Sequence, residues 1–111
     1  MANGILGSAD LAATTYTQIY EVPADNFVVA TVAFVNKTGS PVNVRLAITK
    51  PTNPAPGIPE ADDYLEYDAE ILPSGVLERT GIVLEAGRRV FVRSSSINTV
   101  AMVYGIETAT A

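Results

Sequence analysis

The stretch Gly75–Ser96, GVLERTGIVLEAGRRVFVRSSS, decides the fold of this chain. It contains two runs rich in apolar and β-branched residues, 76–84 and 88–93, separated by the turn sequence Glu85-Ala86-Gly87. Two such runs on either side of a short turn that contains glycine are typical of neighbouring antiparallel strands. The stretch therefore predicts a hairpin, and the remainder of the chain is interpreted around it.

The second run of this hairpin has two chemically different faces. Side chains of a strand alternate between its faces, so Val90 and Val92 share one face while Arg89, Phe91 and Arg93 share the other. The valines are expected to point into a core. A face that combines two arginines with a phenylalanine is expected to contact another part of the protein or a partner.

The rest of the chain also reads as short strands. Turn residues recur roughly every 8 to 12 residues, a spacing typical of antiparallel sandwiches. The expected strands outside the hairpin are 15–22, 27–35, 42–49, 64–71 and 99–107. The fold class is therefore all-β: a single antiparallel β-sandwich, jelly-roll or immunoglobulin-like, of about seven strands. Residues 27–35 and 99–107 are apolar or small on both faces, more than such a sandwich can bury internally.

Two segments lack a strand pattern. Residues 1–14 are small and weakly patterned, and we expect an N-terminal arm before a domain of residues 15–111; a loosely ordered terminus, a short helix from Ser8 and an edge segment are the alternatives. Residues 50–63 hold four of the seven prolines. Proline-rich chain is stiff and extended, so we expect a loop that makes contacts.

Composition excludes several classes of function. The 111 residues correspond to one domain, and with neither Cys nor His the chain lacks disulfides, thiolate ligands and the commonest catalytic base. The net charge of −5 argues against nucleic-acid binding, and no apolar run is long enough to span a membrane. With 48% hydrophobic and 17% charged residues, we expect a homo-oligomer, in the first instance a trimer. No enzyme activity, cofactor or metal is expected.

The charged residues are segregated along the sequence. Half of the twelve acids are Glu60, Asp62, Asp63, Glu66, Asp68 and Glu70. Calcium binding and acid–base chemistry on a sugar are alternatives for them, but they lack EF-hand spacing and alternate as a solvated or interface face would. Four of the five arginines are Arg79, Arg88, Arg89 and Arg93. We expect ion pairs between the two groups, across strands or between subunits; phosphate binding is less favoured because no glycine-rich loop precedes a helix.

Several motifs resemble a family of small virion structural proteins of tailed bacteriophages. The motifs are Leu11-Ala12-Ala13-Thr14-Thr15 with Tyr20-Glu21-Val22-Pro23, the Asn36-Lys37-Thr38 turn before Val42–Ile48, Tyr64-Leu65-Glu66-Tyr67-Asp68, and Gly75–Gly81 with Ala86-Gly87-Arg88-Arg89-Val90. The resemblance spans most of the chain. The proline-rich loop is longer than the family pattern needs.

The resemblance implies a non-enzymatic virion protein, in the first place a capsid decoration or cement protein that stabilises the phage head. The alternative is a structural or receptor- or glycan-binding domain associated with the tail, collar or fibre. Its partners would be the major capsid protein or other virion proteins, and its location the particle assembled in the host cytoplasm. The residues expected to make contacts are Leu6, Leu11, Pro51, Pro54, Pro56, Pro59, Arg79, Arg89, Phe91 and Arg93.

Overall fold

The computed structural model describes residues 3–55 and 57–110 of the chain. These residues form eight strands: β1 (Asn3–Asp10), β2 (Thr17–Glu21), β3 (Asn26–Asn36), β4 (Val42–Thr49), β5 (Tyr64–Ile71), β6 (Val76–Leu84), β7 (Arg89–Ser94) and β8 (Thr99–Ala109). The predicted all-β class is confirmed. Within the described ranges there is no helix that could cross a membrane.

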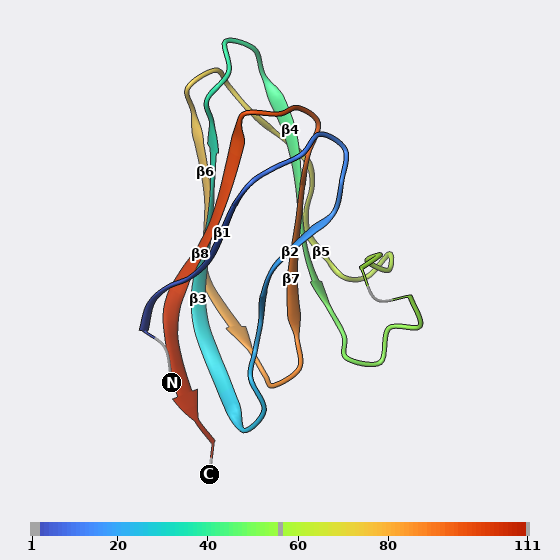
Figure 1. Ribbon diagram of the computed structural model, residues 1–111, viewed down its shortest axis with the longest axis vertical. Helices are drawn as coiled ribbons and strands as arrows, with labels where there is room; N and C mark the ends of the chain where they lie inside the picture. Colours follow the sequence, from blue (N-terminus) through green and yellow to red (C-terminus); the bar gives the residue numbers. More distant parts are fainter. Residues whose placement is uncertain (1–2, 56, 111) are drawn as a thin grey trace.

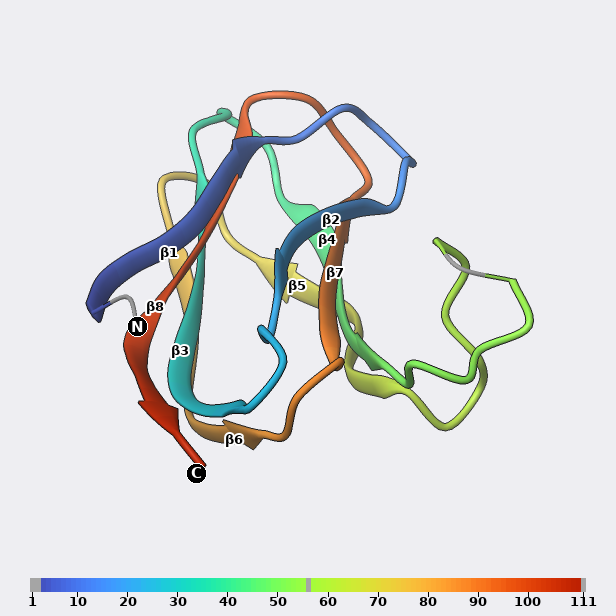
Figure 2. The same ribbon diagram turned by 60° about the horizontal axis from the view of Figure 1, so that its bottom comes forward.

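The strands form two four-stranded antiparallel sheets that face each other (Figures 1 and 2). The first sheet has the order β1-β8-β3-β6 and the second has the order β2-β7-β4-β5. Each of the strands β1 to β4 pairs with one of β5 to β8, so that β1 meets β8, β2 meets β7, β3 meets β6 and β4 meets β5. The chain is thus one long antiparallel ribbon, folded so that β8 also pairs with β3 and β7 with β4.

The predicted hairpin within Gly75–Ser96 is wrong, although both of its strands exist. β6 belongs to the first sheet and β7 to the second, so the turn at Glu85–Arg88 carries the chain from one sheet to the other. The turn before Val42 crosses between the sheets in the same way, since β3 and β4 belong to different sheets. Local turn chemistry does not distinguish the two outcomes, because the partner of each strand is set by distant residues.

The strand count is eight rather than the expected seven or so, and β1 is the additional strand. It lies at the edge of the first sheet, where it pairs with β8 from Asn3 opposite Ile106 to Asp10 opposite Val100. Of the alternatives given above for the N-terminal residues, the edge segment agrees with the structure. Its pattern is weak because β1 passes close to β2: a Cβ on Gly7 would lie 1.9 Å from the carbonyl oxygen of Ile19.

The core lies between the inner faces of the two sheets. As predicted, Val90 and Val92 of β7 point into it and are buried, as are Val44 and Leu46 of β4. The main contributions from the first sheet are Val28, Val32, Phe34, Ala101 and Val103. In β8 the small side chains face inward, so its larger apolar ones lie on the outer face of the first sheet.

Candidate interaction surfaces

The proline-rich loop, residues 50–63, projects from the second sheet between β4 and β5 (Figure 2). It is organised around the carboxylate of Asp63, whose side chain is only 1% exposed. This carboxylate accepts hydrogen bonds from Lys50 Nζ at 2.6 Å, from the amide of Glu60 at 2.8 Å and from Asn53 Nδ2 at 3.2 Å. A buried charge with three donors is well satisfied, so the loop has a defined anchor at its base.

The four prolines expected to make contacts differ in accessibility. Pro51 and Pro54 are exposed and available to a partner, whereas Pro59 is buried and serves the loop itself. Pro56 lies outside the described residues. Ile58 is an exposed apolar side chain of the same loop that the sequence analysis did not single out.

The anchor of the loop should open in acid. Burial raises the pKa of Asp63, but the hydrogen bonds from Lys50, Glu60 and Asn53 outweigh it and hold the pKa below its ordinary value. A lowered pKa in the folded state stabilises the protein above the unfolded-state pKa of about 3.9, and this contribution is lost as the pH falls through the folded-state value. Asp63→Asn is therefore expected to cost about 2 kcal/mol at pH 7 and less at pH 3, where part of the contribution is already lost.

Urea denaturation of the wild type and of Asp63→Asn at both pH values measures this difference. Glu70→Gln is the control, since Glu70 is an exposed acid on β5, and it should leave the free energy of unfolding nearly unchanged at either pH. An equal loss for Asp63→Asn at pH 7 and pH 3 would show that the carboxylate does not anchor the loop.

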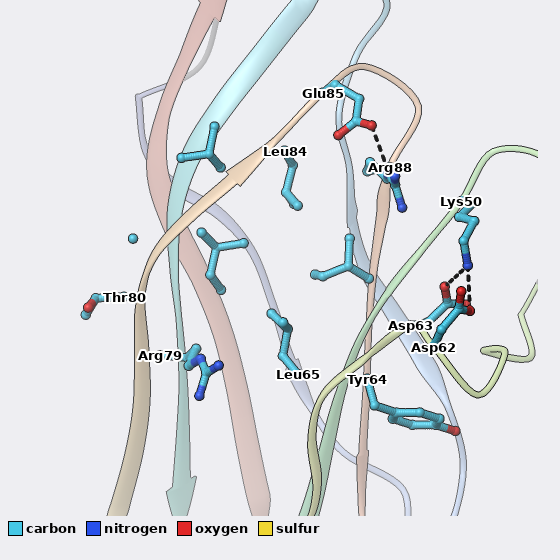
Figure 3. Close-up of a pocket in the computed structure, with 14 residues that line it drawn as sticks. Lys50, Asp62, Asp63, Tyr64, Leu65, Arg79, Thr80, Leu84, Glu85 and Arg88 are labelled. Carbon is cyan, nitrogen blue, oxygen red and sulfur yellow. Dashed lines mark hydrogen bonds and ion pairs between the residues drawn. The ribbon is translucent and has the colours of Figure 1, made fainter.

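A groove of about 570 Å³ opens between the first part of β5 and β6, beside the base of the loop (Figure 3). Leu65, Ile82 and Leu84 contribute apolar side chains to its lining. The cations of its rim are engaged within the chain: Lys50 with Asp62 at 2.8 Å and with Asp63, Arg79 with Glu66 at 2.8 Å, and Arg88 with Glu85 at 3.1 Å. A groove whose cations are already paired is a poor site for phosphate.

The arginine-rich part of the sequence makes fewer contacts with the acidic segment than expected. Of its four arginines, only Arg79 bonds to that segment, through Glu66. Arg89 pairs with Glu21 of β2 at 3.3 Å, and Arg93 lies 5.7 Å from the ring centroid of Tyr16. The observed partners lie within the chain and across strands, which was one of the two expected arrangements.

Three residues expected at an interface pack against the protein itself, and two of them are buried. Leu11, 3% exposed, is part of the core between the sheets, and Leu6 packs partly against the same core. Phe91 points to the outer face of the second sheet as predicted, yet it is buried there. Leu11 and Phe91 stabilise the fold and are not free to meet a partner, whereas Leu6 is half-buried on β1, which joins the sheet.

A cluster of tyrosine and arginine on the second sheet was missed by the sequence analysis. Arg45 of β4 donates to both carboxylate oxygens of Asp68, at 2.7 and 3.2 Å, and to the hydroxyl of Tyr16 at 2.9 Å. Its guanidinium group also stacks 4.0 Å from the ring centroid of Tyr67. The hydroxyls of Tyr16 and Tyr64 are 2.5 Å apart. The cluster therefore brings the rings of Tyr16, Tyr64 and Tyr67 together around Arg45.

Of the ten exposed large hydrophobic residues among those described, six lie on the outer face of β1, β8, β3 and β6, which we call the apolar face. Strand register aligns its side chains in rows, such as Ile106 opposite Val29 and Val29 opposite Val83. A second row places Val100 opposite Val35, which lies opposite Val76. Its exposed large apolar side chains are Ile5, Val29, Val35, Val76, Val83 and Ile106. Residues 27–35, which are apolar on both faces, are covered within the chain on one of them.

Ionisable groups on the apolar face are few and already bonded. Tyr104 extends from β8 across β3 and donates its hydroxyl proton to Glu78 of β6 at 2.5 Å. The hydrogen bond to Glu78 raises the pKa of Tyr104 above its ordinary value. Asp10, at the edge of the face, pairs with Lys37 at 3.6 Å. A partner that binds this face therefore does not need to carry an opposite charge.

Most of the carboxylates considered for calcium or for acid–base chemistry are paired with cations, and three of them, Glu60, Asp62 and Asp63, lie within 3.7 Å of Lys50 Nζ. Glu66 bonds to Arg79 and Asp68 to Arg45, and the described residues contain no group of three or more acids, His or Cys placed to hold a metal ion.

Comparisons of the chain with protein-family models, with curated proteins and with solved structures found no match.

Proposed function

We propose that the protein is a non-enzymatic structural component of a tailed-bacteriophage particle that decorates and stabilises the head. The motif resemblance described above is one support for this proposal. The observation that carries it is the apolar face, a surface over four strands with several exposed aliphatic side chains. Surfaces of this kind on a small protein mark interaction sites, and a subunit of a particle needs such sites to stay attached.

We further propose that the two sheets form a jelly roll. A jelly roll contains eight strands in two sheets connected as Greek keys, and the folded ribbon that pairs β1 with β8 and β4 with β5 fits this description. The same fold occurs in viral capsid proteins and in lectins. Fold alone therefore supports a particle protein and a carbohydrate-binding protein alike.

The two exposed features are suited to different contacts. The loop at 50–63 extends from the second sheet, while the apolar face covers the outside of the first, on the opposite side of the core (Figure 2). A subunit could thus join copies of itself through one feature and contact the major capsid protein through the other. Each contact can be weak, since many copies on a closed shell act together.

Particles are the direct test of this proposal. A phage whose gene for this protein is deleted would be complemented with the wild type or with Ile58→Glu, which changes an exposed apolar residue of the loop. Wild-type particles are expected to contain many copies by mass spectrometry and to release their DNA at a higher temperature than unsupplemented particles. Ile58→Glu should be incorporated less, because a charge would be buried in the contact.

The distribution of the protein in imaged particles separates the alternatives. Density distributed over the head supports decoration, and density confined to the tail, collar or fibre would replace it with the second assignment. Particles that contain none of the protein would refute both. Leu72→Glu is the matched control for Ile58→Glu, because Leu72 is similarly exposed but lies in the β5–β6 turn.

The second candidate is a glycan-binding domain of a tail or fibre. The observation that favours it is Tyr67, a largely exposed aromatic residue beside a hollow of about 470 Å³ that is also lined by Pro59, Ala61 and Tyr64. Aromatic rings are common platforms for sugars. Binding of the purified protein to a bacterial glycan array, lost in Tyr67→Ala and retained in Ile97→Ala, would support this assignment.

A further inference from the structure

We infer that the apolar face is the surface through which two copies of this chain pair about a two-fold axis. This inference rests on the self-association included in the proposed function, and it names the surface and the symmetry that carry it. The face lies on one side of the first sheet. Its side chains form four rows that run across the strands, as the pairing of β1 with β8, of β8 with β3 and of β3 with β6 defines. Pairing would place the outer faces of two first sheets against each other.

The register of the strands arranges the outer side chains in a grid on which another sheet could pack. Exposed aliphatic side chains lie at both ends of the grid, with Val76 and Val35 at one end and Ile106 and Val83 at the other. Between them β3 presents the small side chains Thr31 and Ala33, over which Tyr104 reaches Glu78. Two sheets that pack face to face need complementary apolar surfaces about 10 Å apart, and this grid provides one.

The size of the face matches what a stable pair requires. Four strands about 4.8 Å apart span roughly 19 Å, and the 11 residues of β3 or β8 span roughly 36 Å. The face therefore measures on the order of 700 Å², against about 800 Å² per partner in a standard interface. A single contact between two copies would cover nearly the whole apolar face of both.

Charge favours a second copy as the occupant. Each chain carries a net charge of −5, so copies repel one another unless the contact avoids their charges. The apolar face keeps its charges at its margins: Glu78 lies on the edge strand β6 and accepts a hydrogen bond from Tyr104, and Asp10 lies beside Lys37. A partner must offer an apolar surface of similar size, and the chain itself offers it.

Two-fold pairing also follows from the form of the patch. An isologous contact uses the same patch on both copies, whereas a trimer needs two different complementary patches on each chain. The apolar face is one continuous patch of uniform chemistry. The structure thus favours pairs over the trimer that the sequence analysis put first.

The test is a pair of variants that place the same charge at two equally exposed isoleucines. Ile106 lies on the apolar face and is 57% exposed, while Ile97 lies in the turn between β7 and β8 and is 58% exposed. Wild type and Ile97→Glu are expected to sediment at twice 11.7 kDa at micromolar concentration. Ile106→Glu should self-associate at least about 100-fold more weakly, because pairing would bury an unpaired carboxylate.

Circular dichroism melts show whether each variant is folded, and Val83→Lys tests the same face if Ile106→Glu does not fold. A wild type that is monomeric, a trimer, or a dimer that both face variants leave intact would overturn the inference. None of these results decides the proposed function, which depends on the protein content of particles. Conversely, a dimer that is absent from particles would leave the pairing intact and refute the function.

Discussion

A chain that lacks residues 2–13 is expected not to fold. The deletion removes β1, which pairs with β8 along the edge of the first sheet, and Leu11, which is buried in the core. Loss of a buried leucine side chain alone costs about 2 to 5 kcal/mol, against a total stability of about 5 to 15 kcal/mol for a small domain. Far-UV circular dichroism and urea denaturation should show no cooperative transition for the truncated chain.

A matched control is a chain in which residues 54–58 are replaced by a Gly-Ser-Gly linker. This change shortens the proline-rich loop but keeps Lys50, Asn53, Glu60 and Asp63, which form its anchor. Its free energy of unfolding should fall by less than about 1 kcal/mol, because exposed loop tips tolerate changes in length. A truncated chain that unfolds cooperatively like the wild type would show that residues 2–13 form a dispensable arm after all.

Gly105→Ala is expected to destabilise the protein by about 3 kcal/mol or more, the upper part of the range for overpacking. A Cβ at this position would lie 2.1 Å from the carbonyl oxygen of Val29 and 2.8 Å from the Cα of Ala30. Both atoms belong to the backbone of β3, which is held on its other side by β6, so neither can move aside cheaply. The midpoint of urea denaturation measures the loss.

Gly39→Ala provides the control for this substitution. Gly39 lies in the exposed turn before β4, and a Cβ there would meet nothing within 4 Å. The alanine should change the free energy of unfolding by only a few tenths of a kcal/mol. If the two variants had equal stability, the close approach of β8 to β3 would not constrain residue 105.

Strand alternation in the sequence predicted much of the fold, and it failed where a strand is irregular. The predicted bounds 42–49 and 64–71 coincide with β4 and β5. Strict alternation over 64–71 would place Tyr67 on the same face as Ile71, yet Ile71 is buried and Tyr67 is exposed. The register between β4 and β5 shifts near this point, and Asp68 has a φ of 53°. A bulge of this kind reverses the alternation, and the sequence carries no clear signal for it.

The two faces of β8 show a different limit. The sequence separates Ala101, Val103 and Gly105 from Val100, Met102, Tyr104 and Ile106, but either set could form the inner face. The small set faces inward because the backbone of β8 approaches β3 so closely at Gly105. Hydrophobicity alone would place the larger side chains in the core, so the apolar face could not be located without the structure.

The candidate surfaces depend on residues that are distant in sequence. The bond between Tyr16 and Tyr64 joins positions 48 residues apart, and the bond between Arg45 and Tyr16 spans 29. No local motif encodes such pairs, since each depends on the order of strands in the second sheet. The anchor of the loop is more local: Asp63 and Asn53 lie ten residues apart, but proline content alone did not reveal the buried carboxylate.

The folded ribbon has a consequence for how the protein is made. β8 comes after all other strands in the sequence, yet it lies between β1 and β3. While the chain emerges from the ribosome, β1 and β3 appear without the strand that separates them, and β4 and β5 are the first ribbon partners that can pair. Pairing that spans nearly the whole chain forms slowly, and unpaired strand edges are prone to aggregate until it does. A cell that produces many copies at once would therefore depend on rapid release of β8 from the ribosome. A ribosome that stalls near the end of the mRNA would leave β1 and β3 of the first sheet without the strand that pairs with both.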